Sequence, residues 1–401
     1  QRQMCIRDSY DYPAYFFRKR VHRITRPAAV EEELEDLAEI LSRAEKPLII
    51  VGGGVKYSQA GEAVESFCEE FKIPFGETQA GKSACRSSHP YCLGGIGVTG
   101  TLASNVIAKD ADVVLAIGSR LSDFTTGSKR LFGREDVRFL TINNCRFHAY
   151  KMDAVKAVGD AKATLEALAE KLRGRGYISA YRGEIEAAKE AWDAELKRLG
   201  EITYTGESFE PLIHARDPRT IPEFVELTKG RITQTAALAV LNRLVEPDAT
   251  VITAGGSLPS CMQRMWRTDK RGGYHAEYGY SCMGYEVAAT LGVKFAEPDC
   301  EVYCVAGDSS FQMMHSEIMT IMQERKKVNI LIFDNCGFGC INNLEMNNGI
   351  GSLATEFRYT DGRKPAGDLI YVDYAKIGEG YGLKTYTLSL IHISEPTRQE
   401  A

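Results

Sequence analysis

Short apolar runs, several of which end in glycine or in a polar residue, alternate with amphipathic segments along most of this chain. In the first half, the runs that we predict to be buried strands lie at 47–51, 111–118, 138–143 and 154–158. Helices are predicted at 60–71 and at 30–46, where the apolar face comprises Leu34, Leu37, Ile40 and Leu41. Strands that are apolar throughout are buried on both faces, and their alternation with helices predicts a parallel, doubly wound sheet.

A second unit of the same kind begins near Ile232. Its predicted strands lie at 250–256, 301–308 and 328–335, and its predicted helices at 235–245, 284–296 and 316–325. The stretch between the two units is polar and charged, with one helical segment at 183–199. The chain is therefore predicted to be an α/β protein with two doubly wound parallel-sheet domains in series.

The predicted domain organisation accounts for the whole chain. It comprises artefactual sequence at 1–9, an interdomain connection at 10–29, a central Rossmann-like domain at 30–177, a linker with one helix at 178–230, a second domain at 231–387, and artefactual sequence again at 388–401. The two ends ("QRQMCIRDS" and "LSLIHISEPTRQEA") resemble translated sequencing-adapter sequence and carry no pattern continuous with their neighbours. We therefore expect a fragment whose second domain is incomplete at its C-terminal end.

Composition argues against several classes of partner. The formal net charge is −5 and no long block of Lys and Arg occurs, which argues against nucleic acid and anionic membranes as partners. The apolar runs are also too short to span a bilayer. The eleven cysteines are odd in number and scattered, so we expect reduced packing thiols in a cytoplasmic protein rather than disulfides or zinc ligands.

Two glycine-rich stretches of the first unit suggest phosphate sites. "GETQAGKS" (76–83) fits the phosphate-loop pattern of nucleoside triphosphatases, and "KIPF" before it is a plausible short strand. After Lys82, however, the chain contains Pro90 and lacks the helical periodicity that such a loop requires, so the match is interpreted as accidental. "GGGVKY" after the first strand is either an ordinary turn or a nucleotide or flavin site, although its sixth position is Tyr57 instead of glycine.

The strongest chemical signal lies at the ends of two strands in the second unit. One strand ends in Gly307-Asp308 and the other in Asp334-Asn335, and Asn335 follows Asp308 by 27 residues. Parallel strands finish at the same edge of a sheet, so the Asp308 carboxylate and the Asn335 amide oxygen are expected to meet there. Two such oxygen ligands and a loop carbonyl suit octahedral Mg²⁺, and the helix after Ser309 offers N–H donors to phosphate.

This arrangement resembles the diphosphate-binding signature of thiamine diphosphate enzymes. The resemblance implies that Asp308, Asn335 and the Gly337 carbonyl hold Mg²⁺, while the residues that line the diphosphate are Gly307, Ser309 and Ser310. Ser309 stands where the family usually has glycine, and its hydroxyl could either bind a phosphate oxygen or crowd it.

The stretch "YGYSCMGYEVAA" (278–289) matches a second motif of the same family. The resemblance implies that Ser281, Cys282 and Met283 contact the cofactor. Met283 is expected to support the bent coenzyme, and the Ser281 carbonyl is expected to accept a hydrogen bond from the aminopyrimidine.

From about Tyr10 to Thr387 the chain is most similar to family members that cleave a ring in myo-inositol catabolism. The matching stretches include "KPLIIVGGGVKYS", "GGIGVTGTLASN", "YHAEYGYSCMGYE" and "FDNCGFGCINNLEMNNGIGS". The reaction that this resemblance implies is the hydrolytic C–C cleavage of a trihydroxycyclohexane-1,2-dione to 5-deoxyglucuronate. Residues beside these motifs that could contact the cyclic diketone are His275, Glu277, Asn342 and Asn343, and for each of them a structural hydrogen-bonding role is an equal alternative.

The family resemblance also makes predictions about the assembly. Its activating Glu lies in an N-terminal domain that usually comes from a partner subunit, and residues 1–27 contain no such domain. We therefore expect the chain alone to be inactive and the full-length protein to form a homodimer or homotetramer. The alternatives are an acetolactate-synthase-like lyase or synthase with flavin in the central domain, and a non-catalytic nucleotide-binding module.

Overall fold

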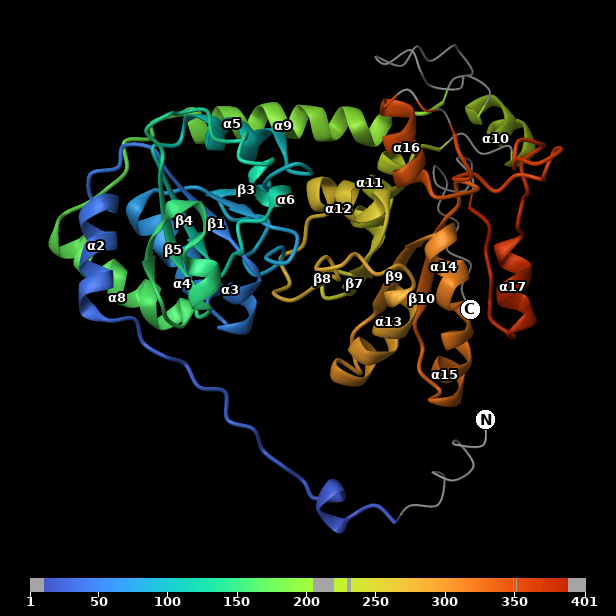
Figure 1. The fold of residues 1–401 in the computed structure, drawn as a ribbon, viewed down its shortest axis with the longest axis horizontal. Helices are drawn as coiled ribbons and strands as arrows, with labels where there is room; N and C mark the ends of the chain where they lie inside the picture. The colour runs from blue at the N-terminus through green and yellow to red at the C-terminus, as the bar shows by residue number, and fades with distance from the viewer. Residues whose placement is uncertain (1–10, 205–219, 229–231, 349, 351, 389–401) are drawn as a thin grey trace.

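The computed structural model describes residues 11–204, 220–228, 232–348, 350 and 352–388, and it contains two parallel β-sheets (Figure 1). The first sheet has six strands in the order β3-β2-β1-β4-β5-β6. Its strands are β1 (Pro47–Val51), β2 (Phe75–Glu77), β3 (Cys92–Gly95), β4 (Val113–Ile117), β5 (Arg138–Ile142) and β6 (Val155–Ala157). Each pairing between these strands is parallel, as the sequence predicts.

Helices cover both faces of this first sheet. One face packs against α2 (Glu31–Leu41), α4 (Gly61–Phe71) and α8 (Ala161–Gly174), and the other against α5 (Leu102–Asp110) and α9 (Glu184–Glu201). Alternate residues of β1 belong to the two cores: Ile49 and Val51 lie in the first, and Leu48 and Ile50 in the second. This burial on both sides explains why the strand is apolar throughout.

The helix predicted at 183–199 is present as α9 and contributes to the core of the central sheet. Its buried residues Ile185, Ala188 and Trp192 belong to the same core as residues of β4 and α5. Figure 1 shows α9 running along one side of the molecule from the central sheet towards α11 (Gln234–Leu244), with which it is in contact. Part of the segment interpreted as a linker is therefore packed against both domains.

The second sheet has four parallel strands in the order β10-β9-β7-β8. The strands are β7 (Thr250–Thr253), β8 (Tyr274–Ala276), β9 (Val302–Gly307) and β10 (Asn329–Phe333). One face packs against α11 and α12 (Ser257–Met265), and the other against α13 (Tyr285–Ala296), α14 (Asp308–Met314) and α15 (Ile318–Gln323). The predicted α/β class with two parallel sheets in series is confirmed.

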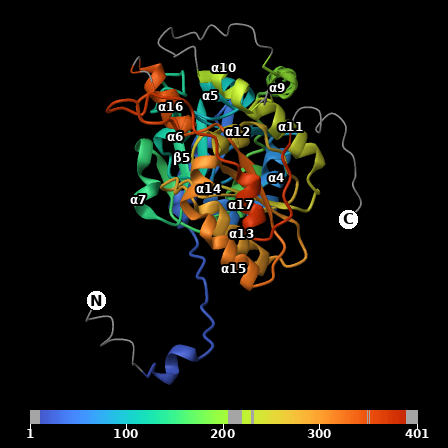
Figure 2. The same cartoon turned by 90° about the vertical axis from the view of Figure 1, so that its right-hand side faces the viewer.

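The other helices of the described residues are mostly short. They are α3 (Gly53–Tyr57), α6 (Asp123–Thr126), α7 (Arg146–Ala149), α10 (Thr220–Thr228), α16 (Gly339–Asn347), α17 (Tyr374–Gly380) and the 3₁₀ turns Ala14–Phe17, Lys151–Asp153 and His315–Glu317. In Figure 2, α13, α14, α15 and α17 face the viewer at the end of the molecule away from the central sheet. Among the described helices, none combines the length and the apolar character that a membrane span requires.

Several predicted element boundaries differ from the structure. The strand predicted at 72–75 lies at 75–77, so Glu77 of the phosphate-loop pattern belongs to a strand. The helix predicted at 316–325 begins with a 3₁₀ turn and becomes α-helical at Ile318. The sequence pattern does not predict β3 or β8, because these short strands include glycine or polar side chains and lack a long apolar run.

Candidate functional site

The ends of β9 and β10 bring the predicted metal ligands to one edge of the second sheet. The two strands pair in parallel, with Gly307 opposite Phe333 as their last partners. Asp308 and Asn335 therefore follow neighbouring strand ends. The order of strands changes direction between β7 and β9, and ligands of doubly wound folds bind at such a switch point.

Asp308 has an unpartnered oxygen in a buried position. Its side chain is 0% exposed, and Oδ2 accepts a hydrogen bond of 2.9 Å from the Gly337 main-chain N–H. Oδ1 has no hydrogen-bond partner among the described residues. Burial and the neighbouring Asp334 carboxylate raise the pKa of Asp308 to about 7, against the lowering effect of the Gly337 and Ser309 N–H groups. A buried carboxylate oxygen without a donor is costly unless a cation binds there, so this residue fits a metal.

The loop after β10 is held in place by hydrogen bonds to a later segment. Phe338 N donates to Thr355 O at 2.7 Å, and Phe357 N donates to Cys336 O at 2.7 Å. A Cβ on Gly337 would lie 2.4 Å from Thr355 O, so only glycine fits there without a shift of the backbone. The loop that carries Gly337 is therefore fixed relative to Asp308.

The composition of the site limits the metals that it could hold. Asn335 is exposed at the start of the same loop. In the described part of the chain, no group of three or more His, Cys, Asp or Glu side chains is arranged to hold a metal ion. A metal here would depend on Asp308 together with amide and main-chain oxygens, a donor set that suits Mg²⁺ rather than zinc.

Open space adjoins the same edge of the sheet. A Cβ built on Gly256 or on Gly307 would meet no atom within 4 Å. Ser309 is buried beside Gly307 at the start of α14. Glycines beside open space, next to main-chain N–H groups that begin a helix, form a cradle that fits a diphosphate.

The turn before α13, which carries the residues of the second motif, lies beside the turn that follows β7. Ser281 has a positive φ of 56°, and Cys282 next to it is exposed. Met283 is half-buried against Gly255: a Cβ on Gly255 would lie 2.7 Å from Met283 Cγ and 3.5 Å from Ser281 O. The structure thus brings the Ser281 carbonyl and the Met283 side chain together beside the turn that follows β7.

Of the predicted substrate contacts, Glu277 and Asn342 make hydrogen bonds that connect segments of the protein. The Glu277 carboxylate accepts hydrogen bonds from Tyr280 N at 3.0 Å and Cys282 N at 2.6 Å. Burial opposes ionisation of Glu277, but these main-chain N–H groups lower its pKa below the ordinary value. Glu277 therefore shapes the turn that carries Met283.

Asn342, the second of these residues, lies in a buried hydrogen-bond network. Its Nδ2 donates to Glu356 Oε1 at 3.1 Å, and its Oδ1 accepts from Thr355 Oγ1 at 3.1 Å. The amide thus joins α16 to the segment that holds the Gly337 loop. Asn343 follows it on the same helix.

His275 lies in β8, at the boundary with the central domain. It is half-buried, and burial, together with the nearby Lys56, lowers its pKa below the ordinary value. A neutral imidazole is therefore favoured at this position.

Glu286 is a site residue that the sequence reasoning missed. It is the second residue of α13 and is 0% exposed. The Ser310 hydroxyl donates to both of its oxygens, at 2.9 and 3.0 Å. Ser310, which the family resemblance places beside the diphosphate, therefore has its hydroxyl proton committed to Glu286. The signal that could have found this residue is an acidic side chain inside "MGYEVAA", where the neighbouring positions are apolar.

The phosphate-loop pattern of the central domain has a structural explanation. After Lys82 the chain forms turns rather than a helix. Lys82 is buried, with Nζ 4.0 Å from Glu77 Oε2, and Ser83 N donates to Glu77 Oε1 at 3.0 Å. The pattern therefore lacks the helix N-terminus that would bind phosphate, which agrees with the interpretation that the match is accidental.

The same stretch makes several of the polar contacts between the two domains. Gln79 Nε2 donates to Pro259 O at 2.7 Å, and the Tyr274 hydroxyl donates to Gln79 Oε1 at 3.0 Å. Gln263 Nε2 donates to Glu77 O at 3.2 Å. Residues of "GETQAGKS" thus position β8 and α12 of the second domain against the central sheet.

The Gly52–Gly54 turn is explained by close packing of two backbones. A Cβ on Gly52 would lie 2.3 Å from Gly118 O, and one on Gly54 would lie 2.6 Å from Gly118 Cα. The turn after β1 therefore contacts the turn after β4 directly. This packing accounts for the glycines without a nucleotide or flavin.

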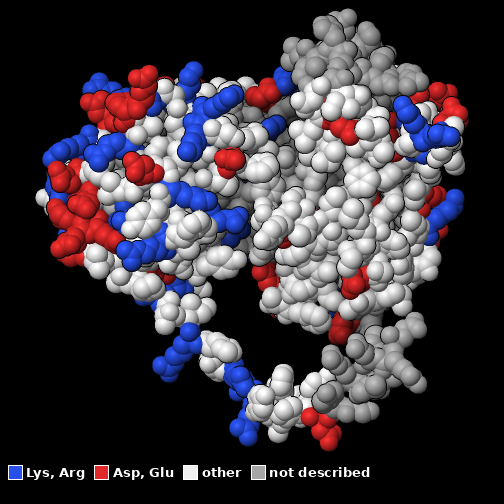
Figure 3. Space-filling view, in the orientation of Figure 1, with Lys and Arg blue, Asp and Glu red and all other residues white. Residues whose placement is uncertain are grey.

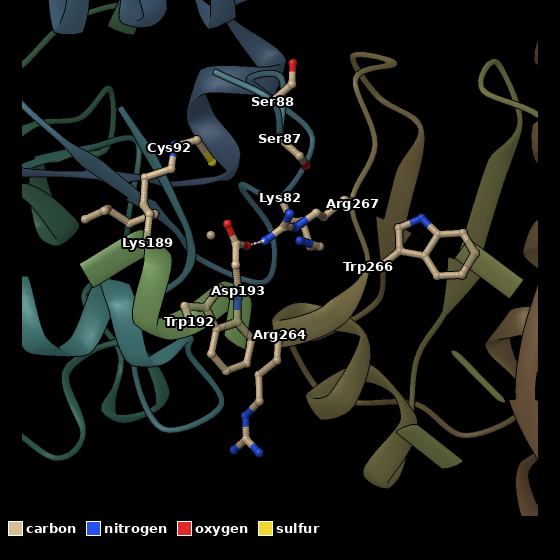
Figure 4. A pocket seen from close by; sticks show the side chains of 12 residues that line it. Lys82, Ser87, Ser88, Cys92, Lys189, Trp192, Asp193, Arg264, Trp266 and Arg267 are labelled. Carbon is tan, nitrogen blue, oxygen red and sulfur yellow. Dashed lines mark hydrogen bonds and ion pairs between the residues drawn. The ribbon is translucent and has the colours of Figure 1, made fainter. Parts of the chain in front are cut away.

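A pocket of about 240 Å³ lies between α9, α12 and the loop after β2 (Figure 4). Its charged lining residues are Lys82, Lys189, Asp193, Arg264 and Arg267. Figure 4 shows Arg267 directed at Asp193, with which it forms an ion pair, whereas the Arg264 guanidinium points away from them. The pocket belongs to the domain boundary, and its positive charge is partly balanced by Asp193.

Comparisons with known proteins match both domains. Residues 34–168 match the family described as "Thiamine pyrophosphate enzyme, central domain", and residues 254–399 match "Thiamine pyrophosphate enzyme, C-terminal TPP binding domain". Both descriptions agree with the family that the sequence motifs resemble, and this prediction is confirmed.

Curated relatives carry the name 3D-(3,5/4)-trihydroxycyclohexane-1,2-dione hydrolase. One from Clostridium perfringens (strain ATCC 13124) is 60% identical over 385 residues, which cover 96% of this chain and 60% of the relative. Others from Clostridium botulinum (strain Alaska E43) and Bacillus thuringiensis (strain Al Hakam) are 57% and 53% identical, covering 95% and 94% of this chain and 59% of each relative. The chain thus spans about 60% of the length of the curated relatives that it matches.

Proposed function

This chain belongs to the thiamine pyrophosphate enzyme family, and we propose that it holds thiamine diphosphate and Mg²⁺ at the edge of its second sheet. The observation that carries the proposal is the unpartnered, buried Oδ1 of Asp308. It lies at the switch point of the sheet, next to the open space at Gly307 and Gly256. A metal-bound diphosphate would satisfy this carboxylate and fill that space.

In this proposal, one group of residues at the sheet edge binds Mg²⁺ and another binds the diphosphate. Asp308, Asn335 and the Gly337 carbonyl hold Mg²⁺ through oxygen atoms. Gly307, Ser309 and the N–H groups at the start of α14 face the diphosphate, and the Ser309 hydroxyl is able to donate to it.

The turn before α13 serves the organic part of the cofactor in this proposal. Ser281 supplies a carbonyl acceptor, Cys282 forms part of the turn, and Met283 supplies an apolar surface beside Gly255. When bound, thiamine diphosphate supplies the nucleophilic and electron-accepting chemistry of its thiazolium ring. The residues of this chain then orient that ring and keep water from its apolar side.

The proposed reaction is the hydrolytic C–C cleavage of trihydroxycyclohexane-1,2-dione to 5-deoxyglucuronate, within myo-inositol catabolism. Support comes from relatives named as hydrolases of this dione that are 60% identical over 96% of the chain. His275, Glu277, Asn342 and Asn343 remain proposed substrate contacts. The hydrogen bonds of Glu277 and Asn342 within the protein support a structural role for those two residues as well.

A homodimer or homotetramer in the cytoplasm completes the proposal. The helices α13, α14 and α15 cover one side of the second sheet and expose large apolar side chains, which we term the α13–α15 face: Tyr285, Phe295, Met313, Met314, Met319 and Met322. In Figure 3 the second domain shows few charged side chains towards the viewer, whereas the central domain shows many. An exposed apolar surface supports association with another protein surface.

The cysteines support the proposed cytoplasmic location. The ten described cysteines are free, which suits a reducing compartment.

A chimera tests the proposed reaction. Residues 30–387 of this chain would replace the corresponding part of the Clostridium perfringens relative, and NMR would follow the conversion of the dione to a ring-opened carboxylate. We expect conversion that requires both thiamine diphosphate and Mg²⁺ and that the Asp308→Asn variant loses. A chimera that binds thiamine diphosphate and Mg²⁺ but does not consume the dione would contradict the substrate assignment.

A further inference from the structure

Glu286 joins three separate segments of the second domain through its buried carboxylate. It accepts hydrogen bonds from Gly255 N at 3.2 Å and from Gly284 N at 3.0 Å. The Ser310 hydroxyl donates to it as well, at 2.9 and 3.0 Å. These donors come from the turn after β7, the turn before α13 and the first turn of α14.

Hydrogen bonds, rather than an opposite charge, hold this carboxylate. Among the described residues, no lysine or arginine forms an ion pair with Glu286, although its side chain is 0% exposed. A buried carboxylate is tolerated when several N–H or O–H donors satisfy its oxygens. Oε1 accepts from Gly255 N and Ser310 Oγ, and Oε2 accepts from Gly284 N and Ser310 Oγ. A side chain with two acceptor oxygens is therefore needed at this position.

The three segments share one location in the fold. Gly255 follows β7 and Ser310 follows Asp308 after β9, so both lie at the switch point of the sheet. Gly284 is adjacent to Met283, whose side chain lies against Gly255. The carboxylate therefore connects the metal-binding end of the candidate site to the turn that carries Met283.

We propose that Glu286 is a positioning residue that fixes these three segments around the cofactor cradle before the cofactor binds. This inference rests on the proposed function, in which the cradle takes thiamine diphosphate. Because the Ser310 hydroxyl and the Gly255 and Gly284 N–H groups are committed to Glu286, they are held in place rather than being free to donate to the diphosphate. Loss of the carboxylate leaves these donors unsatisfied and loosens the cradle.

Hydrogen exchange in the cofactor-free chain tests the positioning role directly. In Glu286→Ala we expect the Gly255 amide to exchange at least about tenfold faster than in the unmodified chain, because it loses its acceptor. A smaller increase is expected at Gly284, whose N–H also donates to Ser310 Oγ at 2.8 Å. Glu286→Gln keeps the volume of the side chain and one acceptor oxygen, so we expect a smaller increase in exchange. This variant provides the test if the alanine variant fails to fold.

Thr290→Val provides a matched control on the same helix. Thr290 is buried, and its Oγ1 donates to the Glu286 main-chain oxygen at 2.6 Å without contacting the carboxylate. This variant perturbs α13 but leaves the three segments joined. Unchanged exchange at Gly255 and Gly284 in both Glu286 variants, or an equal increase in Thr290→Val, would overturn the proposal.

Cofactor binding gives a second readout that does not depend on turnover. By calorimetry with Mg²⁺ present, we expect Glu286→Ala to weaken thiamine diphosphate binding by at least about tenfold, while Thr290→Val binds as the unmodified chain does. Equal affinity in the Glu286→Ala variant and the unmodified chain would overturn the inference alone. If the unmodified chain binds no thiamine diphosphate, the proposed function fails, and exchange at Gly255 and Gly284 still decides whether Glu286 fixes the segments.

Discussion

The main-chain N–H of Gly337 donates a hydrogen bond of 2.9 Å to the Asp308 carboxylate and so ties the loop after β10 to the end of β9. The chain between the two residues forms α14, a 3₁₀ turn, α15 and β10, yet they meet because β9 and β10 pair in parallel. This bond uses Oδ2 and leaves Oδ1 without a partner in the described residues. The position of Gly337 therefore fixes the orientation of the Asp308 carboxylate, including that of Oδ1.

Replacing Gly337 with alanine should destabilise the second domain. The new Cβ would lie 2.4 Å from Thr355 O, a main-chain atom, so the loop must shift. We expect a loss of about 1–3 kcal/mol in the free energy of unfolding, measured by urea denaturation. Gly292→Ala in α13 is the matched control, because its Cβ meets nothing within 4 Å and glycine is unfavourable inside a helix. Equal stability of the Gly337→Ala variant and the unmodified chain would show that the loop is not constrained in this way.

Replacing Met283 with alanine should weaken the binding of the organic part of the cofactor without affecting the binding of the diphosphate. We expect thiamine diphosphate to bind about tenfold more weakly, because apolar contact is lost, whereas Mg²⁺–pyrophosphate should bind with unchanged affinity. Met322→Ala, on the surface of α15, serves as the control. Titration calorimetry with both ligands measures the difference. An equal loss for both ligands would mean that Met283 supports the cradle rather than the organic part of the cofactor.

Lys56 should make the stability of the chain depend on alkaline pH. Its Nζ donates to Tyr274 O at 2.8 Å across the domain boundary, and burial lowers its pKa from 10.5 to about 8 despite the attraction of Glu77. Between these two pH values the unfolded state binds more protons at this residue, so its contribution to stability rises with pH. Urea denaturation at pH 7.5 and pH 10 should show the unmodified chain gaining stability relative to Lys56→Met. A difference that stays constant, or that shrinks with pH, would contradict the assigned direction.

Charge placed on the α13–α15 face should reduce self-association. Met313 and Met319 are 50% and 57% exposed, and glutamate at both positions would put charge into the proposed interface. Sedimentation velocity should show a shift towards monomer for the double variant Met313→Glu/Met319→Glu. Phe147→Glu, at an exposed position of α7 in the central domain, is the control. If the double variant and the unmodified chain sediment alike, this face is not the interface.

Much of the fold could be predicted because its strands are buried on both sides. The strands β1, β4, β9 and β10 appear in the sequence as apolar runs, and their parallel pairing follows from the helices between them. The same reasoning predicts that Asp308 and Asn335 follow neighbouring strand ends, because parallel strands finish at one edge. The apolar runs and the parallel direction of the strands therefore predict both the fold class and the position of Asp308 and Asn335.

Other features depend on tertiary contacts that a linear pattern does not carry. The role of Lys82 follows from its burial beside Glu77 at the domain boundary, whereas its local pattern indicates a phosphate loop. Glu286 stands in the first turn of α13, where acidic residues commonly cap a helix, and only the folded chain shows that Gly255 and Ser310 converge on it. The short strand β8 forms because "GETQAGKS" and β7 hold it, and its own three residues do not specify it.

The most direct measurement is the Mg²⁺-dependent binding of thiamine diphosphate to the unmodified chain and to Asp308→Asn, by titration calorimetry at pH 8. Asparagine keeps the size of the side chain and removes the negative charge that the cation would neutralise. We predict that the unmodified chain binds thiamine diphosphate only when Mg²⁺ is present, and that Asp308→Asn lowers this affinity at least about tenfold. Equal affinity in the two proteins, or binding that ignores Mg²⁺, would contradict the assignment of the metal and diphosphate site to this edge of the sheet.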